Sequence, residues 1–254
     1  MAGVSCLVAA SAHAANRQPC SASQLAALGK AAHAAHFASR DQDPDGVLRD
    51  AACKPAPGAP GTTLAVVAWG DGPDNAVPGL LAVLDDASGR VLASLREDFV
   101  QDPLTDIRDD VLHLDTAPYL LAPGVRAFGV DIEHHDGPRY ADGGVDRSRA
   151  LYVREGAAVR RVLDEIDMST WTYVSDSVPA AASSPEEADR AVQHFKITIA
   201  IGPQASHGWH DLVLTATSCC EAGHDFPPLH VRLPYDGRGY PLKAFEDAYW
   251  RWRK

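Results

Sequence analysis

The sequence has few positive charges and lacks any long apolar run. Its 23 lysines and arginines stand against 34 aspartates and glutamates, which gives a formal charge of −11. A chain this acidic disfavours binding to nucleic acid or to anionic membranes, and it suits a soluble protein that meets a cation or a basic partner. No apolar run approaches the roughly 18 residues of a transmembrane helix, so we expect no membrane span.

The short motifs of common enzyme classes are also missing. The chain has no G-x-S-x-G, no G-x-G-x-x-G and no P-loop, which weighs against serine hydrolases, dinucleotide enzymes and ATPases. It also lacks H-E-x-x-H and C-x-x-C, which weighs against zinc proteases, zinc ribbons and thioredoxin-like redox sites. The sequence therefore favours a non-enzymatic protein but does not decide the question.

The first residues, MAGVSCLVAASAHAAN, carry no charge and are small and apolar. Ala12-His13-Ala14 fits the small-residue rule for a secretory cleavage site. We interpret residues 1–14 as the remnant of a signal peptide and expect the protein in the periplasm of a Gram-negative bacterium or outside the cell.

Cysteine usage is consistent with export. After removal of residues 1–14, four cysteines remain, and a bridge between the neighbours Cys219 and Cys220 would be strained. The favoured pairing is Cys20–Cys53, which would tie an N-terminal helix to the start of the sheet. A bridge from either of these to the 219–220 pair is the rival.

Hydrophobic periodicity predicts a mainly β protein. Ser21-Ala22-Ser23-Gln24 is a capping box that opens an Ala/Leu-rich helix reaching to Phe37. About a dozen short apolar or alternating runs follow, separated by turn residues, and they outnumber the helices too heavily for a βαβ fold. The pattern predicts an antiparallel meander, which forms a sandwich, an open barrel or a small propeller, with one or two further short helices. The expected strands are 63–69, 80–85, 90–97, 111–115, 118–121, 125–133, 149–155, 157–166, 169–175, 194–202, 210–217, 229–235 and 240–244.

The chain divides into unequal parts. Residues 15–53 hold the helix and an acidic loop, and the Pro/Gly-rich residues 54–62 are predicted to be a linker. Residues 63–254 are expected to form a single β-rich domain. Within it, 184–195 has the capping serine, the proline and the acidic first turn of a helix, and the tail 245–254 could form another.

The stretch DQDPDGVLRDAA, 41–52, begins like a calcium loop. Asp41, Asp43 and Asp45 occupy the first three ligand positions and Gly46 the sharp turn, but Ala52 stands where a bidentate Glu is needed. The alternatives are a solvated acidic turn and a weak calcium site completed from elsewhere. Calcium is the one possible cofactor.

Histidines provide weaker metal candidates. His207, His210 and Asp211 lie close together before a strand and could hold a transition metal with ligands from 133–136 or 224–225. His33 and His36 lie one helical turn apart. The alternative in each case is polar surface histidines.

Two segments resemble a family of exported, functionally uncharacterised proteobacterial proteins. These are LDTAPYLLAPGVRAFGVDI at 114–132 and LYVREGAAVRRVL at 151–163. The resemblance extends over most of residues 50–245 and implies a β-rich periplasmic or secreted protein. It implies no activity and no functional residue.

Three functions from different classes remain. The first is an exported non-enzymatic β-protein that binds another protein in an inhibitor or immunity-type role, and its acidity favours a basic partner. The second is a metal-dependent periplasmic hydrolase that uses His207, His210 and Asp211. The third is a calcium-stabilised surface or adhesion module that uses Asp41, Asp43 and Asp45.

Overall fold

A computed structural model describes residues 19–70, 76–101, 105–134, 143–173, 192–219 and 226–253. Most of these residues lie in one twelve-stranded sheet. The helices are α1 (Ala22–Ala32) and α3 (Lys243–Trp252), and both are too short to cross a bilayer. The strands are β1 (Leu48–Pro55), β2 (Thr62–Trp69), β3 (Ala76–Asp85), β4 (Val91–Val100), β5 (Leu112–Asp115), β6 (Leu120–Ala122), β7 (Val125–Glu133), β8 (Gly143–Glu155), β9 (Ala158–Tyr173), β10 (Val192–Ser206), β11 (Trp209–Cys219) and β12 (Leu229–Leu233).

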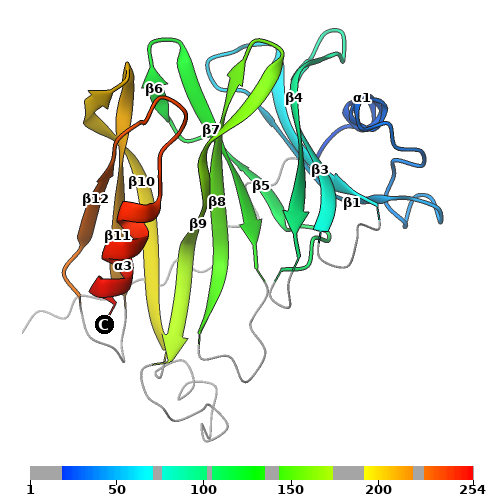
Figure 1. Ribbon diagram of the computed structural model, residues 1–254. Coiled ribbons are helices and arrows are strands. Elements are labelled where there is room, and N and C mark those ends of the chain that lie inside the picture. The colour runs from blue at the N-terminus through cyan, green and yellow to red at the C-terminus, as the bar shows by residue number, and fades with distance from the viewer. Residues whose placement is uncertain are drawn as a thin grey trace, which may run out of the picture.

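The sheet curls into a nearly closed barrel (Figure 1). β1 to β4 form an antiparallel meander, and β4 meets β9 at a single parallel pair, Ser94 with Ala158. β9 pairs with β8, β8 with β7 and β7 with β5, which lies against β1. The far half of β9 also pairs with β10, and β11 and β12 extend the sheet beyond the barrel. This confirms the predicted mainly β fold, in the open-barrel form.

Side chains close the barrel where backbone ladders are missing. Between β1 and β5, the buried Asp50 carboxylate accepts hydrogen bonds from the backbone N–H groups of Val111 at 2.9 Å and Leu112 at 2.7 Å. Higher on the same seam, Lys54 Nζ donates to the Leu114 carbonyl at 3.2 Å. Buried backbone amide groups need hydrogen-bond acceptors. In a regular sheet the carbonyl groups of the neighbouring strand are these acceptors, and here the Asp50 carboxylate takes their place.

The second seam lies between β4 and β9. Glu97 on β4 forms an ion pair with Arg161 on β9, and it accepts a hydrogen bond from the Tyr152 hydroxyl at 2.7 Å. Burial, and next the negative charge of Glu97, raises the pKa of Tyr152, so this phenol stays protonated and donates. The ion pair bridges two strands that share only one backbone pair.

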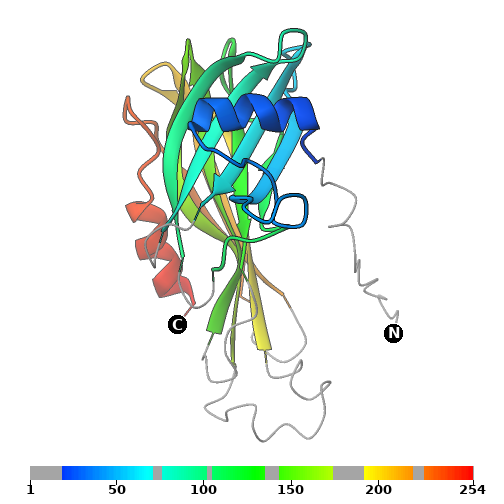
Figure 2. The ribbon, with the colours of Figure 1, turned by 90° about the vertical axis from the view of Figure 1, so that its right-hand side faces the viewer.

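Three apolar clusters follow from the alternation of side chains along the strands. The first fills the barrel, where alternate residues such as Leu64, Val66 and Ala68 of β2 face inward. Their neighbours Ala65 and Val67 face outward and are covered by α1, which crosses the outside of β2 and β3 (Figure 2). The third cluster lies between the extended sheet and α3. Because both faces of β2 are covered, seven of its eight residues are buried.

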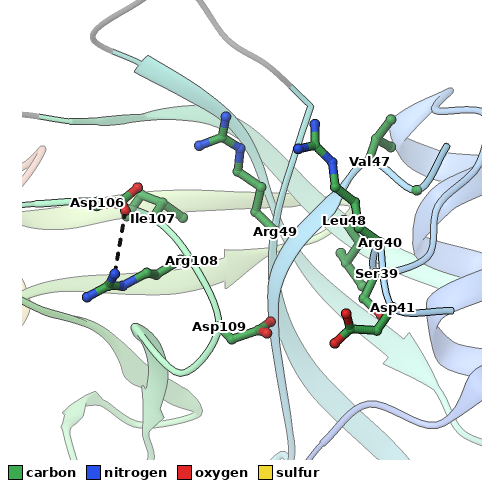
Figure 3. Close-up of a pocket in the computed structure, with 11 residues that line it drawn as sticks. Ser39, Arg40, Asp41, Val47, Leu48, Arg49, Asp106, Ile107, Arg108 and Asp109 are labelled. Atoms are coloured by element: carbon green, nitrogen blue, oxygen red, sulfur yellow. Dashed lines mark ion pairs between the residues drawn. The ribbon is translucent and has the colours of Figure 1, made fainter. Parts of the chain in front are cut away.

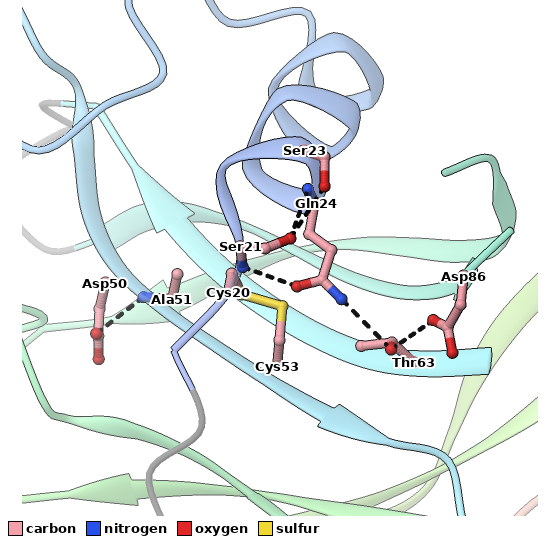
Figure 4. The surroundings of a disulfide bond; sticks show 9 residues. All are labelled: Cys20, Ser21, Ser23, Gln24, Asp50, Ala51, Cys53, Thr63 and Asp86. Carbon is pink, nitrogen blue, oxygen red and sulfur yellow. Dashed lines mark hydrogen bonds between the residues drawn. A yellow bond between two sulfur atoms is a disulfide. The ribbon is translucent and has the colours of Figure 1, made fainter. Parts of the chain in front are cut away.

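The disulfide anchors α1 to β1. Ser21 caps the helix in the predicted capping box, and the preceding Cys20 is bonded to Cys53 (Figure 4). Gln24 also donates to Thr63 on β2 at 3.4 Å. The favoured cysteine pairing is therefore confirmed.

Replacing both cysteines by serine is expected to lower the free energy of unfolding by about 3 kcal/mol. The bridge joins residues 33 apart in sequence, and constraining a loop of that length in the unfolded chain stabilises the fold by roughly 3–4 kcal/mol. Urea unfolding of the Cys20→Ser/Cys53→Ser protein measures this, with reduced wild type as the matched control. A loss below about 1 kcal/mol would show that the bridge constrains little.

Several predicted segments differ from the structure. Residues 54–62 are not a linker, because Lys54 and Pro55 end β1 and the remaining residues turn into β2. Pro55 is tolerated because β1 begins the strand order and Pro55 ends the strand. The first helix stops at Ala32 rather than Phe37, since His33 adopts a left-handed conformation. Residues 240–244 lead into α3 instead of forming a strand, and 184–191 lie outside the described residues.

Candidate binding site at the end of the barrel

A cavity of about 230 Å³ lies inside one end of the barrel, the upper end in Figure 1. The β1–β2 turn, from Ala56 to Ala59, borders it on one side, and β6–β7 and β8 border it on others. Three inward side chains form its apolar floor: Leu64, Val83 and Phe128. The mouth of a β-barrel with an apolar floor is a common place for small ligands.

Two arginines line this cavity. Arg126 lies two residues before Phe128 on β7, and Arg154 two residues after Tyr152 on β8, so each faces the same side of the sheet as a core residue. Arg126 donates from one terminal nitrogen to the Thr116 carbonyl at 3.0 Å. Its Nε is buried and has no acceptor among the described residues.

Neutral groups hold both arginines in the described part of the chain. Arg154 Nε donates to the Gly156 carbonyl at 3.0 Å, and no carboxylate pairs with Arg154 or Arg126 within the described part of the chain. Six other arginines of the described residues pair with acidic side chains: Arg108, Arg147, Arg149, Arg160, Arg161 and Arg232. Arg96 resembles the cavity arginines, because it donates to a backbone carbonyl, that of Ala31. What distinguishes Arg126 and Arg154 is that both line one cavity.

A larger cleft of about 340 Å³ lies near the other end of the barrel, between the 39–49 segment and residues 106–109. Figure 3 shows Asp41 and Asp109 on opposite sides of β1 and the side chains of Arg40 and Arg49 extending in one direction. Arg49 is held by the Gly70 carbonyl at 2.7 Å and by Gln101 at 3.2 Å. Since three arginines and three aspartates line this cleft, its charges balance and favour no ligand charge.

The predicted calcium loop does not gather its three aspartates. Asp41 lines the cleft just described, whereas Asp43 and Asp45 lie with His36, their ligand atoms within 4.8 Å of one another. Asp43 binds the His36 ring at 3.0 Å and accepts from the Asp45 backbone at 3.0 Å. Position 12 of the loop, Ala52, is buried in the barrel core. The residues present are therefore a histidine and two carboxylates, a set that suits transition metals better than calcium.

We expect His36 to titrate above its ordinary pKa of 6.5. The hydrogen bond and the charge of Asp43 raise the pKa of His36, and the same hydrogen bond lowers that of Asp43. Because the folded-state pKa of His36 is raised, the stabilisation it gives is complete at low pH and is lost as pH rises through that pKa. An NMR titration of the imidazole measures the shift, and Asp43→Asn should return the pKa toward 6.5. An unchanged value in this variant would contradict the pairing.

The second predicted metal cluster is dispersed. His207 lies in the exposed β10–β11 turn, and His210 and Asp211 are consecutive on β11, so their side chains point to opposite faces. Asp211 is fully buried and forms an ion pair with Arg232 at 3.3 Å. In the described ranges, only His36, Asp43 and Asp45 form a group of three metal-capable side chains. The expected partner ligands at 135–136 and 224–225 lie outside these ranges.

His134, another of the expected partner ligands, belongs to a polar network that the sequence analysis missed. Its Nε2 lies 2.9 Å from the Ser148 hydroxyl, which donates to Glu165 at 2.6 Å, and its Nδ1 lies 2.7 Å from Thr105. Ser148 is fully buried. The Ser148 hydroxyl donates its hydrogen bond to Glu165 and is not exposed to solvent, so it is not available as a nucleophile. The network instead connects β8 and β9 with the end of β7.

The C-terminal segment that holds Trp250, Trp252 and Arg253 packs largely onto the protein itself. Trp252 lies edge-on to Phe195 and donates to the Pro227 carbonyl at 2.8 Å, and Arg253 lies over the Phe195 ring. Trp250 remains 60% exposed. The tail is therefore mainly part of the third apolar cluster.

The chain matches no protein-family model, and no curated protein or solved structure is similar enough to match it. The site is therefore interpreted from its own geometry.

Proposed function

We propose that this chain is an exported, non-enzymatic binding protein that takes its ligand at the arginine-lined end of the barrel. The observation that carries the proposal is the cavity itself, with an apolar floor made of core side chains and two arginines that pair with no carboxylate among the described residues. Such a combination of apolar surface and a few placed polar groups is typical of ligand sites. The disulfide supports the export part of the proposal, since such bonds persist in oxidising compartments.

The other candidates have less support from the geometry. The hydrolase would need His207, His210 and Asp211 to converge, and they lie on a turn and on two faces of β11. The calcium module would need Asp41 beside Asp43 and Asp45, and it lines a separate cleft.

Binding to another protein, as the composition suggests, stays a prediction. The exposed large apolar side chains Val100, Leu120 and Trp250 belong to β4, β6 and α3 and form no patch of neighbours along one element. Pull-downs from periplasmic and culture fractions at low salt test this prediction, because a basic partner steered by charge should be lost as salt is added.

A fragment screen followed by backbone amide NMR tests the proposed function. Small fragments that bind should shift the signals of cavity residues such as Gly58 and Gly124. Ala59→Trp should abolish these shifts, because the exposed Ala59 borders the cavity and a large ring there blocks it. Ala87→Trp, exposed on the β3–β4 turn and outside the cavity lining, is the matched control and should bind as wild type does. If no fragment shifts the cavity signals, the proposal is wrong.

Export has its own test. Produced with its full N-terminal segment in a Gram-negative host, the protein should appear in the periplasm or the medium. We expect its first residue to follow Ala14. Intact, reduced protein confined to the cytosol would contradict export.

A further inference from the structure

Resting on the proposed function, we infer that the cavity at the end of the barrel binds a small carboxylate with a compact apolar body. The class of ligand follows from which groups line the cavity and which of them lack partners. Leu64, Val83 and Phe128 offer apolar contact, and Arg126 and Arg154 offer hydrogen-bond donors with positive charge.

No carboxylate among the described residues cancels the positive charge of this cavity. Arg126 is partly anchored through the Thr116 carbonyl at 3.0 Å and the Ala117 carbonyl at 3.4 Å, so its guanidinium is held in place by neutral groups. Arg154 is oriented in the same way by Gly156. Carbonyl partners fix the direction of a guanidinium and leave its charge available, and a carboxylate is the group whose geometry a guanidinium matches best.

The buried Nε of Arg126 supports the same conclusion. A buried donor without an acceptor costs roughly as much as a lost hydrogen bond, and this one has no acceptor among the described residues. Because this Nε has almost no accessible surface, a ligand in the cavity meets the other nitrogens of the guanidinium. An oxyanion provides acceptors for them, and a cationic or purely apolar ligand provides none.

The volume indicates how much of a ligand the cavity can enclose. At the ~30 Å³ that one water molecule occupies in the liquid, 230 Å³ has room for roughly eight non-hydrogen atoms. Hexanoate has this size and combines a short apolar chain with a carboxylate. The overall formal charge of −11 disfavours a large acidic partner at the same place, whereas a small monoanion interacts mainly with the nearest charges.

Three probes of equal chain length test the inference by amide NMR on the full protein: hexanoate, hexan-1-ol and hexylammonium. Hexanoate should shift the Gly58 and Gly124 signals and bind at least tenfold more tightly than hexan-1-ol. Arg126→Gln and Arg154→Gln should each weaken hexanoate about tenfold and leave hexan-1-ol within twofold. Arg90→Gln, an exposed arginine on the β3–β4 turn outside the cavity lining, should change neither.

The outcomes separate the two proposals. Equal binding of hexan-1-ol, or tighter binding of hexylammonium, overturns the carboxylate inference and leaves the binding function in place. Hexanoate shifts that lie away from the cavity, or an affinity for hexanoate that is unchanged in Arg154→Gln, also overturn it. Arg154 is exposed, so this variant keeps the test valid even if Arg126→Gln folds poorly. Failure of every fragment and every probe to reach the cavity overturns the binding function itself.

Discussion

An Asp50→Ala variant is expected to unfold with a free energy about 4 kcal/mol below that of the wild type. Asp50 is only 2% exposed, and its carboxylate accepts from the Val111 and Leu112 amides where β5 has no strand ladder with β1. Hydrogen bonds to a charged group contribute roughly 1.5–3 kcal/mol each, and their loss leaves two buried donors without an acceptor. Urea unfolding monitored by tryptophan fluorescence measures the change.

Asp50→Asn is the matched control. The Val111 and Leu112 amides both donate to Oδ2, so an amide oxygen at this position can still accept from both. The amide nitrogen then takes the place of Oδ1, which accepts from the Ala51 and Asp110 amides, so about half of the loss should be recovered. A free energy of Asp50→Ala within about 1 kcal/mol of wild type would mean that this carboxylate does not close the β1–β5 seam.

Arg149→Met is expected to destabilise the protein by a similar amount, about 4 kcal/mol. Arg149 binds both oxygens of the buried Asp131, at 2.5 and 2.6 Å, and also pairs with Asp115. It donates to the Tyr119 hydroxyl at 2.8 Å, and that hydroxyl donates to Asp115 at 2.7 Å. Removing one partner of a buried ion pair typically costs 3–5 kcal/mol because the other charge stays buried. Thermal and urea unfolding measure the loss.

The double variant Arg149→Met/Asp131→Asn checks that reason. It removes the buried charge together with its partner, so it should be more stable than the sum of the two single changes predicts. Strict additivity would show that Arg149 acts through packing alone. Arg149→Lys, which keeps the charge and loses the two-pronged contact, should fall between wild type and Arg149→Met.

Much of the fold could be predicted from the sequence, because most strands have strong alternation or continuous apolar runs. β2 and β7 are examples, and the expected strands 80–85 and 90–97 correspond to β3 and β4. β1 was missed because Leu48–Pro55 contains charged and small residues that are poor strand formers in isolation. The closure of the barrel could not be predicted from local sequence patterns, because Asp50 and Lys54 bond to partners about 60 residues away in the sequence.

The disulfide was predictable, and the cavity was largely not. Strain between adjacent cysteines favoured Cys20–Cys53 over a bridge between neighbours, and the structure has this bond. For the cavity there was one usable signal. Arg126 alternates in phase with Phe128, Val130 and Ile132, so the pattern places an arginine on the same face as three core residues. An arginine on the core face does not by itself identify a site. The cavity exists only because the fold places the β1–β2 turn beside β7.

For the acidic loop, the sequence suggested a site that the structure does not form. The spacing of Asp41, Asp43 and Asp45 suggested a shared ligand set, but a turn sends Asp41 toward the cleft and brings His36 to the other two. Backbone hydrogen bonds from Val47 and Ala38 to the His36 carbonyl fix this arrangement.

A crystal structure of the protein soaked in hexanoate tests the central claim most directly. We predict one hexanoate in the barrel-end cavity, with its carboxylate within hydrogen-bond distance of both Arg126 and Arg154 and its chain against Phe128. A cavity that stays closed to hexanoate, or a carboxylate turned away from both arginines, would contradict the account.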